Sequence, residues 1–587
     1  MAEHTKVLEL KQILGQDDPS AFISWTWTTY NNQRMQKINE WREVRDYLFA
    51  TDTRTTSNKM LPWKHSTTTP KLCQIRDNLH SNYISSLFPN DQWLKWQAYD
   101  RSSASKNKAN AIEVYMENKC RENHFRTTIS QLVLDYIDYG NCFGTVSFSE
   151  VYKTLADGTK VPDYIGPVLT RISPLDIVFN PLGDSFKRNF KIVRSVRGIG
   201  ELKRLAQDDP EQKFWLDAIK RREHISRVMG GYSYEDFEKA CGYTADGFGN
   251  MYEYYRGSYM EILEFFGDYM DPKSGELKEN RLITICDRSF MARDIQLPEW
   301  YGGAPIVTCR WRIRPDNLWG MGPLDNLVGM QYMIDHLQNA QADAHDLIIQ
   351  PPLKIRGEVE EFTWGPSTEI RLGAEGSDVE PLQTSMQAII SAKQSIQELE
   401  NKMELYAGAP RDAMGIRTPG EKTAFEVQQL NNAAGRIFQE KVTNFEIEFL
   451  EPILNMMLET ACRNLDGADL IRVEDNDIGV QEFMKITKQD ITANGKICPI
   501  GARHFAKQAQ DLQNVVGIFG SPIGQIISPH VSSIALAKFV EDMTNIQGWD
   551  IIQPNIAVHE QNERQQLMNQ AQEDQAVQQQ MPAQQGV

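Results

Sequence analysis

Apolar residues in the first 310 positions recur first at helical spacing and then in alternation. Intervals of three and four residues predict helices, whereas strict alternation predicts half-buried strands. The alternating run from Cys142 to Tyr152 is followed by an Asp-Gly pair, which is typical of a hairpin turn. These patterns predict helices at 25–48, 75–87, 109–139 and 201–227, and strands at 142–152, 259–266, 281–286 and 304–311. A strand pair broken by Pro174 is expected at 168–179. The predicted body is therefore a mixture of helices and strands.

Two apolar stripes in the second half predict a pair of long helices around a small β module. Pro323 is expected at the first position of the first helix, with Asp325 in its first turn, where the helix dipole favours an acid. That helix should end before the two prolines at 351–352, because a residue preceding proline is pushed out of the helical region. The elements expected here are helices at 322–350 and 385–406 and strands at 353–356 and 369–372.

A loop rich in glycine, proline and arginine, at 407–420, separates this pair from a further helical stretch at 421–464. Pro452 lies inside that stretch and should kink or split it near Leu450, since proline lacks the amide donor of a helix. Beyond it we expect a strand pair at 470–491, a helical region at 502–558 and a solvated, glutamine-rich tail from 561.

Charge and cysteine content narrow the classes of function. The 587 residues carry a net charge of −17, which disfavours a protein that wraps nucleic acid tightly, because neutralising phosphates needs clustered Lys and Arg. The eight cysteines include no CxxC pair, so we expect neither a zinc site nor a secreted disulfide framework. We expect no signal peptide, since the first residues lack an apolar stretch.

One uncharged stretch, at 512–537, is long enough to span a bilayer. It contains Pro522, Pro529 and several glycines and polar residues, which a lipid environment would penalise. A broken, buried helical hairpin is therefore the favoured interpretation, and we expect no membrane partner.

No pattern in the chain meets the requirements of a catalytic or cofactor site. Residues 415–423 resemble a Walker A loop, but Glu421 displaces the lysine and a predicted helix precedes the loop where a strand is required. The Gly-Met-Gly at 320–322 lacks the third glycine of a dinucleotide fingerprint. The acidic run from Asp475 lacks a glutamate at the last position of a calcium loop. We therefore expect no enzyme activity, no metal and no cofactor.

Three segments carry a family resemblance. They read RPDNLWGMGPLDNLVGMQYMIDH at 314–336, MGIRTPGEKTAFEV at 414–427 and RISPLDIVFNP at 171–181. The first two resemble the central region of portal proteins, the head–tail connectors of tailed bacteriophages, and the third resembles part of the portal wing. The order of the predicted elements is also similar to that of the family along the whole chain.

The resemblance implies an α+β portal fold and a structural role. Portal subunits form a ring, usually of twelve, at one capsid vertex, where the terminase motor packages DNA and the DNA later leaves. The implied regions are a mixed α/β wing at 1–321 and 421–500, a two-helix stem at 322–350 and 384–406, a small β clip at 351–383, a channel loop at 407–420, a helical crown at 501–560 and the glutamine-rich tail at 561–587. The acidic balance suits a channel through which DNA must slide.

The resemblance also implies two groups of site residues. The basic residues expected near the DNA channel are Arg411, Arg417 and Lys422. The clip residues expected to dock the motor or an adaptor are Glu358, Glu360, Glu361 and Trp364. The alternative for the basic group is ordinary surface charge or a local salt bridge, and for the clip group a solvated acidic turn with a buried tryptophan.

The expected partners are further copies of the chain in a ring, the terminase motor, head–tail adaptor and tail proteins, capsid and scaffolding proteins, and double-stranded DNA without sequence preference. The expected location is the portal vertex of the virion, after synthesis in the host cytoplasm. Two other interpretations stay open. One is a head–tail adaptor or other structural virion oligomer that does not conduct DNA. The other is an ATPase of the packaging motor, which the spoiled Walker A loop disfavours.

Overall fold

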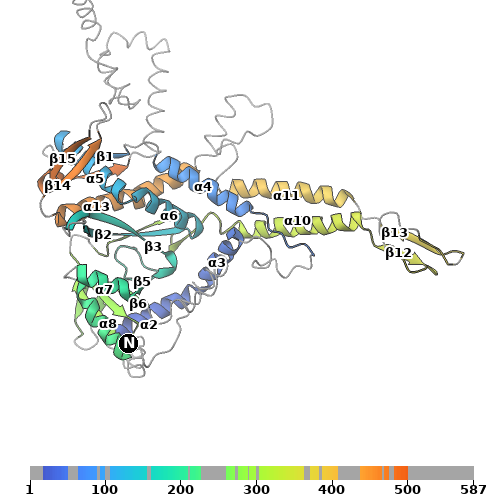
Figure 1. Ribbon diagram of the computed structural model, residues 1–587, viewed down its shortest axis with the longest axis horizontal. Coiled ribbons are helices and arrows are strands. Elements are labelled where there is room, and N and C mark those ends of the chain that lie inside the picture. Colours follow the sequence, from blue (N-terminus) through green and yellow to red (C-terminus); the bar gives the residue numbers. More distant parts are fainter. Residues whose placement is uncertain are drawn as a thin grey trace, which may run out of the picture. The chain divides into compact units, whose positions relative to one another are not determined.

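The computed structural model describes residues 18–49, 64–88, 93–99, 106–154, 160–208, 212–225, 259–270, 275–288, 290–298, 303–362, 370–373, 375–382, 386–407, 437–465, 468–474 and 481–499. The chain divides into two compact units, of which the first comprises Met1–Asp466 and Lys488–Pro499 and the second Gly467–Thr487 and Ile500–Val587. Helices and strands are mixed in the first unit, which confirms the α+β class (Figure 1).

The N-terminal part of the first unit is helical. Its helices are α2 (Asp18–Gln33), α3 (Met35–Phe49), α4 (Lys71–Leu87), α5 (Lys106–Glu122) and α6 (Phe125–Asp138). The helices predicted at 25–48 and 109–139 are each divided in two, and neither break contains glycine or proline. At the first break, the Arg34 guanidinium donates hydrogen bonds to the carbonyls of Pro174 and Ile177, both at 2.7 Å. At the second, His124 adopts a left-handed φ of 51°.

Two antiparallel sheets complete this body. The three-stranded sheet has the order β3-β2-β9, with β2 (Asn141–Thr154), β3 (Lys160–Ile172) and β9 (Ile306–Arg310). The five-stranded sheet has the order β4-β5-β6-β7-β8, with β4 (Ile177–Phe179), β5 (Lys191–Gly198), β6 (Tyr259–Met270), β7 (Leu277–Cys286) and β8 (Phe290–Gln296). The strands predicted at 142–152, 259–266, 281–286 and 304–311 are confirmed. The strand pair predicted at 168–179 with a break at Pro174 is also confirmed, and the two strands, β3 and β4, belong to different sheets.

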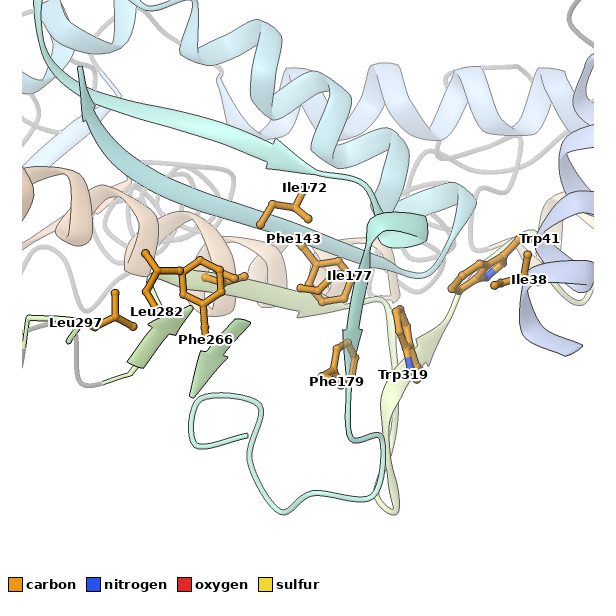
Figure 2. Close-up of a cluster of buried hydrophobic side chains, with 11 residues drawn as sticks. Ile38, Trp41, Phe143, Ile172, Ile177, Phe179, Phe266, Leu282, Leu297 and Trp319 are labelled. Carbon is orange, nitrogen blue, oxygen red and sulfur yellow. The ribbon is translucent and has the colours of Figure 1, made fainter. Parts of the chain in front are cut away.

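A cluster of buried side chains draws on both sheets (Figure 2). Phe143 comes from β2 and Phe179 from β4, and the Trp319 ring stacks on Phe179 with 4.6 Å between ring centroids. Trp41 of α3 meets Trp319 edge-on at 5.5 Å. Trp319 lies on β11 (Asn317–Met321), which pairs with β10 (Arg312–Arg314). This aromatic cluster therefore fixes the chain just before the predicted helix pair.

The helix predicted at 201–227 is also two helices, α7 (Ile199–Asp208) and α8 (Phe214–Ile225). Leu202 of α7 and Trp215 of α8 pack in a buried cluster with Ile262 of β6 and Phe290 of β8. The pair therefore buries residues of the five-stranded sheet.

The helix pair of the second half is α10 (Val328–Ile349) and α11 (Met386–Tyr406), with β12 (Leu353–Arg356) and β13 (Asp378–Pro381) between them. The helix expected from 322 begins later because Asp325 lies in a preceding turn, where its carboxylate accepts from the amide of Gly322 at 3.2 Å and pairs with Lys37 at 2.7 Å. The partner of β12 is β13 and not the predicted run at 369–372, from which Leu372 makes only an isolated bridge.

The described part of the stretch predicted at 421–464 is helical, with a π-helical turn at Glu446–Leu450 followed by α13 (Glu451–Asn464). Pro452 stands in the first turn of α13, so the helix is interrupted next to the proline as predicted. The remaining elements of the first unit are β1 (Leu94–Ala98), its antiparallel partner β16 (Gly495–Pro499), and α14 (Lys488–Ile491).

The described residues of the second unit form the antiparallel pair β14 (Ala468–Glu474) and β15 (Gln481–Thr487), which confirms the strand pair predicted there. The helical region predicted at 502–558, the uncharged stretch at 512–537 and the glutamine-rich tail lie outside the described residues. Among the helices that are described, none combines the length and apolarity needed to cross a bilayer.

Candidate functional site

The helix pair and its hairpin form the most distinctive surface of the described chain. Figure 1 shows α10 and α11 side by side, with the β12–β13 hairpin at their far end. Burial decreases along α10, from Ile334 with no exposed surface to Ile349 with 75% of its surface exposed. The exposed large apolar residues of the two helices are Met333, Leu347, Ile349, Ile390, Leu405 and Tyr406. The first unit alone therefore leaves much of the apolar surface of this pair in water.

One face of α10 is polar and yet buried. Gln331, Asp335, Asn339 and Asp343 recur at every fourth position, and we call them the polar ladder. The first three have at most 1% of their surface exposed. Buried polar side chains are stable only when they are hydrogen-bonded, so the partners of the ladder are decisive.

The partner of the polar ladder is the segment 64–72, which is extended up to Thr69 and enters α4 at Lys71. Asp343 accepts from the amides of residues 64 and 65, at 2.8 and 3.1 Å. Asn339 binds both the amide of residue 67, at 3.0 Å, and its carbonyl, at 2.9 Å. Asp335 accepts from the amide of residue 69 at 2.9 Å. Each ladder side chain thus meets the backbone about two residues further along the segment.

The geometry of the two chains explains this register. Four helical residues advance about 6.0 Å, and two extended residues advance about 6.6 Å. The spacing of side chains at every fourth position of α10 therefore matches the spacing of every second peptide unit in an antiparallel extended segment. Burial opposes ionisation of Asp343, but hydrogen bonds from His65 and from the Lys64 amide hold the pKa of its carboxyl below the ordinary value.

Gln331 ends the ladder at the N-terminus of α4. Its side-chain oxygen accepts from the Leu72 amide at 3.1 Å, and its nitrogen donates to the Thr69 carbonyl at 2.6 Å. The first amides of a helix have no partner within that helix, and Pro70 at the N-cap position supplies no side-chain hydrogen bond. Gln331 therefore caps α4 from a different helix.

A buried ion pair joins α4 to α11. Lys71 and Glu404 each have 6% of their side-chain surface exposed, and Lys71 Nζ lies 2.5 Å from Glu404 Oε1. Together with the Gln331 contact, this pair connects both long helices to α4. The base of the helix pair is thus held by buried polar contacts.

The predicted clip residues lie partly within the described chain. Glu358, Glu360 and Glu361 follow β12 and are exposed. The backbone there is ordered by two hydrogen bonds, from the Gly373 amide to the Glu358 carbonyl at 3.0 Å and from the Glu360 amide to the Arg371 carbonyl at 3.3 Å. Trp364 lies outside the described residues. The structure therefore places the three carboxylates at the surface but does not test their docking role.

The three predicted channel residues, Arg411, Arg417 and Lys422, lie outside the described residues, as do the Walker-like loop at 415–423 and the acidic run from Asp475. Their role therefore stays a prediction. Residues 328–406 contain 13 acidic and five basic residues. The helix pair and its hairpin thus carry a net charge of −8, which is nearly half of the chain's total of −17.

Within the described residues, the side chains offer no arrangement suited to metal binding, since no three His, Cys, Asp or Glu residues converge. Cys142 and Cys309 face each other across β2 and β9 in the register, and burial raises the pKa of both thiols well above the ordinary value. These thiols therefore stay protonated and unreactive. What the described surface offers is contact area and charge.

Sequence reasoning missed the polar ladder, although its spacing is visible in the printed sequence. Four hydrogen-bonding residues at intervals of four, inside a helix that is otherwise striped with apolar residues, indicate a buried polar face. The partner segment could not be identified in the same way, because it lies about 260 positions earlier in the chain and contains no matching pattern.

The described chain is thus an α+β protein in which a long helix pair carries a small β hairpin. Residues 299–474 match the family described as bacteriophage head to tail connecting protein. The match contains β9, the helix pair, the hairpin and β14, and it contains two of the three segments that resemble portal proteins. It confirms the resemblance to the head–tail connectors of bacteriophages, which are structural proteins of the phage particle. No curated protein matches the chain.

Proposed function

We propose that the chain is a portal protein. It assembles into a ring, usually of twelve copies in this family, at one vertex of the phage capsid. The ring is the channel for DNA packaging and ejection and the attachment point of the tail. The observation that carries this proposal is the family match at 299–474, since it coincides with the helix pair and its hairpin. The protein acts as a structural component of the virion and not as an enzyme.

The exposed apolar residues of the helix pair support assembly. Burying a large apolar side chain contributes about 1.5–3 kcal/mol. Ile349 and Leu405 expose 75% and 61% of their surface in the single chain, so a neighbouring copy that covers them gains a large part of that energy. The net charge of −8 on the same region supports a DNA path, because an acidic wall lets a polyanion slide without arrest.

The regions follow from this proposal. The wing is 1–321 with 421–500, the stem 322–350 with 384–406, the clip 351–383, the channel loop 407–420 and the crown 501–560. Within the proposed stem, the described helices are α10 at Val328–Ile349 and α11 at Met386–Tyr406. The clip docks the terminase motor and the head–tail adaptor, and the capsid and scaffolding proteins surround the ring.

The decisive experiment combines sedimentation velocity with negative-stain images of the purified chain. A closed ring with an open axial channel is the expected result. Only monomers and dimers at micromolar concentration, or a filled particle, would contradict the proposal. A ring whose removal leaves DNA packaging intact would indicate an adaptor, and DNA-stimulated ATP hydrolysis would indicate the packaging motor.

The docking role of the clip is tested by Trp364→Ala and Glu360→Lys. Both variants should form rings but bind the terminase motor or the adaptor more weakly, because docking uses the exposed charge and the aromatic side chain. Glu279→Lys, at an exposed position on β7, is the matched charge reversal and should bind normally. Normal packaging and infectivity of both clip variants would remove the docking assignment.

The channel role is tested by replacing Arg411 and Arg417 together with alanine. Each contact with a phosphate is solvent-exposed and worth roughly 0–1 kcal/mol, but a ring repeats it in every copy. Rings and procapsids should form, while fewer heads retain full-length DNA in pulsed-field electrophoresis. The control is Lys203→Ala with Arg204→Ala, two exposed residues on α7. If the double variant and the wild type yield equal amounts of full-length genomes, the loop is only a passive connection between helices.

A further inference from the structure

Three arginines alternate along the chain where β9 passes into β10. Arg310 ends β9, and Arg312 and Arg314 begin and end β10. The residues between them differ, since Trp311 is buried and Ile313 has 47% of its surface exposed. We call Arg310, Arg312 and Arg314 the arginine row. The three arginines occupy every second position of the chain, which bends at Trp311 between the two strands.

The arginine row has no acidic partner within the part of the chain that the structure describes. The contacts of Arg310 and Arg312 are to neutral groups. Arg310 reaches the Asn317 carbonyl at 3.4 Å, and Arg312 lies over the Trp311 ring with 5.3 Å to the centroid. By contrast, Arg76 and Arg171 are each held by two hydrogen bonds to one aspartate. The row is therefore a concentration of uncompensated positive charge in a chain of net charge −17.

The surroundings keep the row accessible. Lys441 Nζ also lies over the Trp311 ring, 5.3 Å from its centroid, but it pairs with Glu440 at 3.5 Å, so the unpaired charge belongs to the arginines. Among the described strands, β10 pairs only with β11, so its other edge carries no strand. The exposed Ile313 adds an apolar contact beside the charges.

We propose that the arginine row docks on a carboxylate-bearing face of the neighbouring copy of this chain. The proposal rests on the ring assembly proposed above and identifies one side of its interface. Like charges repel, so the row cannot face the row of another copy, and the contact must join two different faces. Such heterologous contacts are the kind that close into rings.

The described features favour a second copy over DNA. The Trp311 ring is buried and covered by Arg312 and Lys441, so it offers no surface for base stacking. An exposed isoleucine between arginines suits a protein interface, where arginine and apolar side chains meet. A copy of this chain supplies the complementary charge, since it has 17 more acidic than basic residues.

The test is the double variant Arg312→Glu with Arg314→Glu, compared with Lys203→Glu and Arg204→Glu on α7 as the matched charge reversal. The concentration at which half of the wild-type chain is assembled should rise at least about tenfold in the row variant and stay unchanged in the control. High salt should weaken wild-type assembly in the same direction. Equal thermal unfolding of both variants establishes that they fold.

A second variant identifies the partner carboxylate. Arg312→Lys keeps the charge and introduces an amine, which a carbodiimide joins to a contacting carboxylate. The expected product is an amide bond between two copies, mapped by mass spectrometry. Cross-links only within one chain, or none in assembled rings, overturn the proposal.

The outcomes separate this inference from the proposed function. If the wild-type chain never assembles, the portal proposal fails. If rings form equally well from the wild type and from the row variant, only the docking proposal fails. If assembly is unchanged but binding to a double-stranded DNA oligonucleotide is lost in the row variant, then the row binds phosphates and the docking proposal is wrong.

Discussion

The capping of α4 by Gln331 gives a sharp test of the polar ladder. The substitution Gln331→Leu keeps nearly the same volume, so it creates little cavity, but it removes every hydrogen bond of the amide. Gln331 is fully buried, and the Leu72 amide then loses its partner, while the Thr69 carbonyl keeps its hydrogen bond from the Lys71 amide at 2.8 Å. One unsatisfied buried polar group costs about 1–3 kcal/mol, so the expected loss is of that size, about 2 kcal/mol.

The assay is hydrogen exchange, followed by mass spectrometry of the peptide that spans 64–75. The first amides of α4 and the amide of Thr69 should exchange faster in the variant, because the segment opens locally without unfolding the rest. A loss of 2 kcal/mol corresponds to about 30-fold faster exchange, at 1.36 kcal/mol per factor of ten. His345→Leu, at an exposed position of the same helix, makes a similar polar-to-apolar change and should leave that peptide unchanged.

The companion variant Gln331→Glu adds a pH test. The oxygen that accepts from Leu72 remains, but the donor is lost and a second carboxyl now lies one turn from the buried Asp335. Burial and this neighbour should raise the pKa of the new carboxyl, so protection should be greatest at low pH and fall as pH rises through that pKa. If exchange of the peptide is the same in the wild type and in Gln331→Leu, the capping argument is refuted.

Two further predictions concern buried charges. Glu404→Gln leaves Lys71 buried without its carboxylate and should destabilise the fold by about 3–5 kcal/mol, measured by thermal unfolding, whereas replacing both residues by apolar ones should cost much less. Burial raises the pKa of Asp135 to about 6, against the opposing hydrogen bonds and charge of Arg171. Because the pKa is higher in the folded than in the unfolded state, the free energy of unfolding rises as pH falls. The wild type should gain roughly 1 kcal/mol of stability between pH 7 and 5, and Asp135→Asn should not. A difference in stability between the two proteins that stays constant over this pH range would contradict the prediction.

Elements with a clean period were predictable from the sequence, and those with buried charges were not. The alternation of β2 and β6 and the stripe of α11 appear in the structure where they were expected. By contrast, β5 was missed because two of its buried positions are Lys191 and Arg194, and charged residues at buried positions hide the apolar pattern of a strand. Lys191 is buried with its ammonium donating to two backbone carbonyls, and Arg194 pairs with Glu261 at 2.6 Å.

The helix breaks show a second limit. The sequence around Arg34 contains no helix-breaking residue. The helix breaks there because the Arg34 guanidinium binds the carbonyls of residues 174–177, which only the folded chain brings close to it. The start of α10 shows the same limit, since Asp325 reads as a first-turn acid but instead pairs with Lys37 of α3. In the candidate site, the sequence located the hairpin and its three exposed glutamates, whereas the polar ladder depends on a partner segment that only the tertiary structure supplies.

The orientation of α10 inverts the usual arrangement of an amphipathic helix. At about 100° per residue, Met333 lies about 160° around the helix from both Gln331 and Asp335. The polar side is thus fixed inside the chain, against the extended segment, while Met333 remains 43% exposed on the opposite side. A single copy would gain little from this inversion, because it leaves apolar surface in water. In the ring proposed above, another copy that covers this side makes the arrangement favourable, and the polar ladder then sets which face of α10 takes part in assembly.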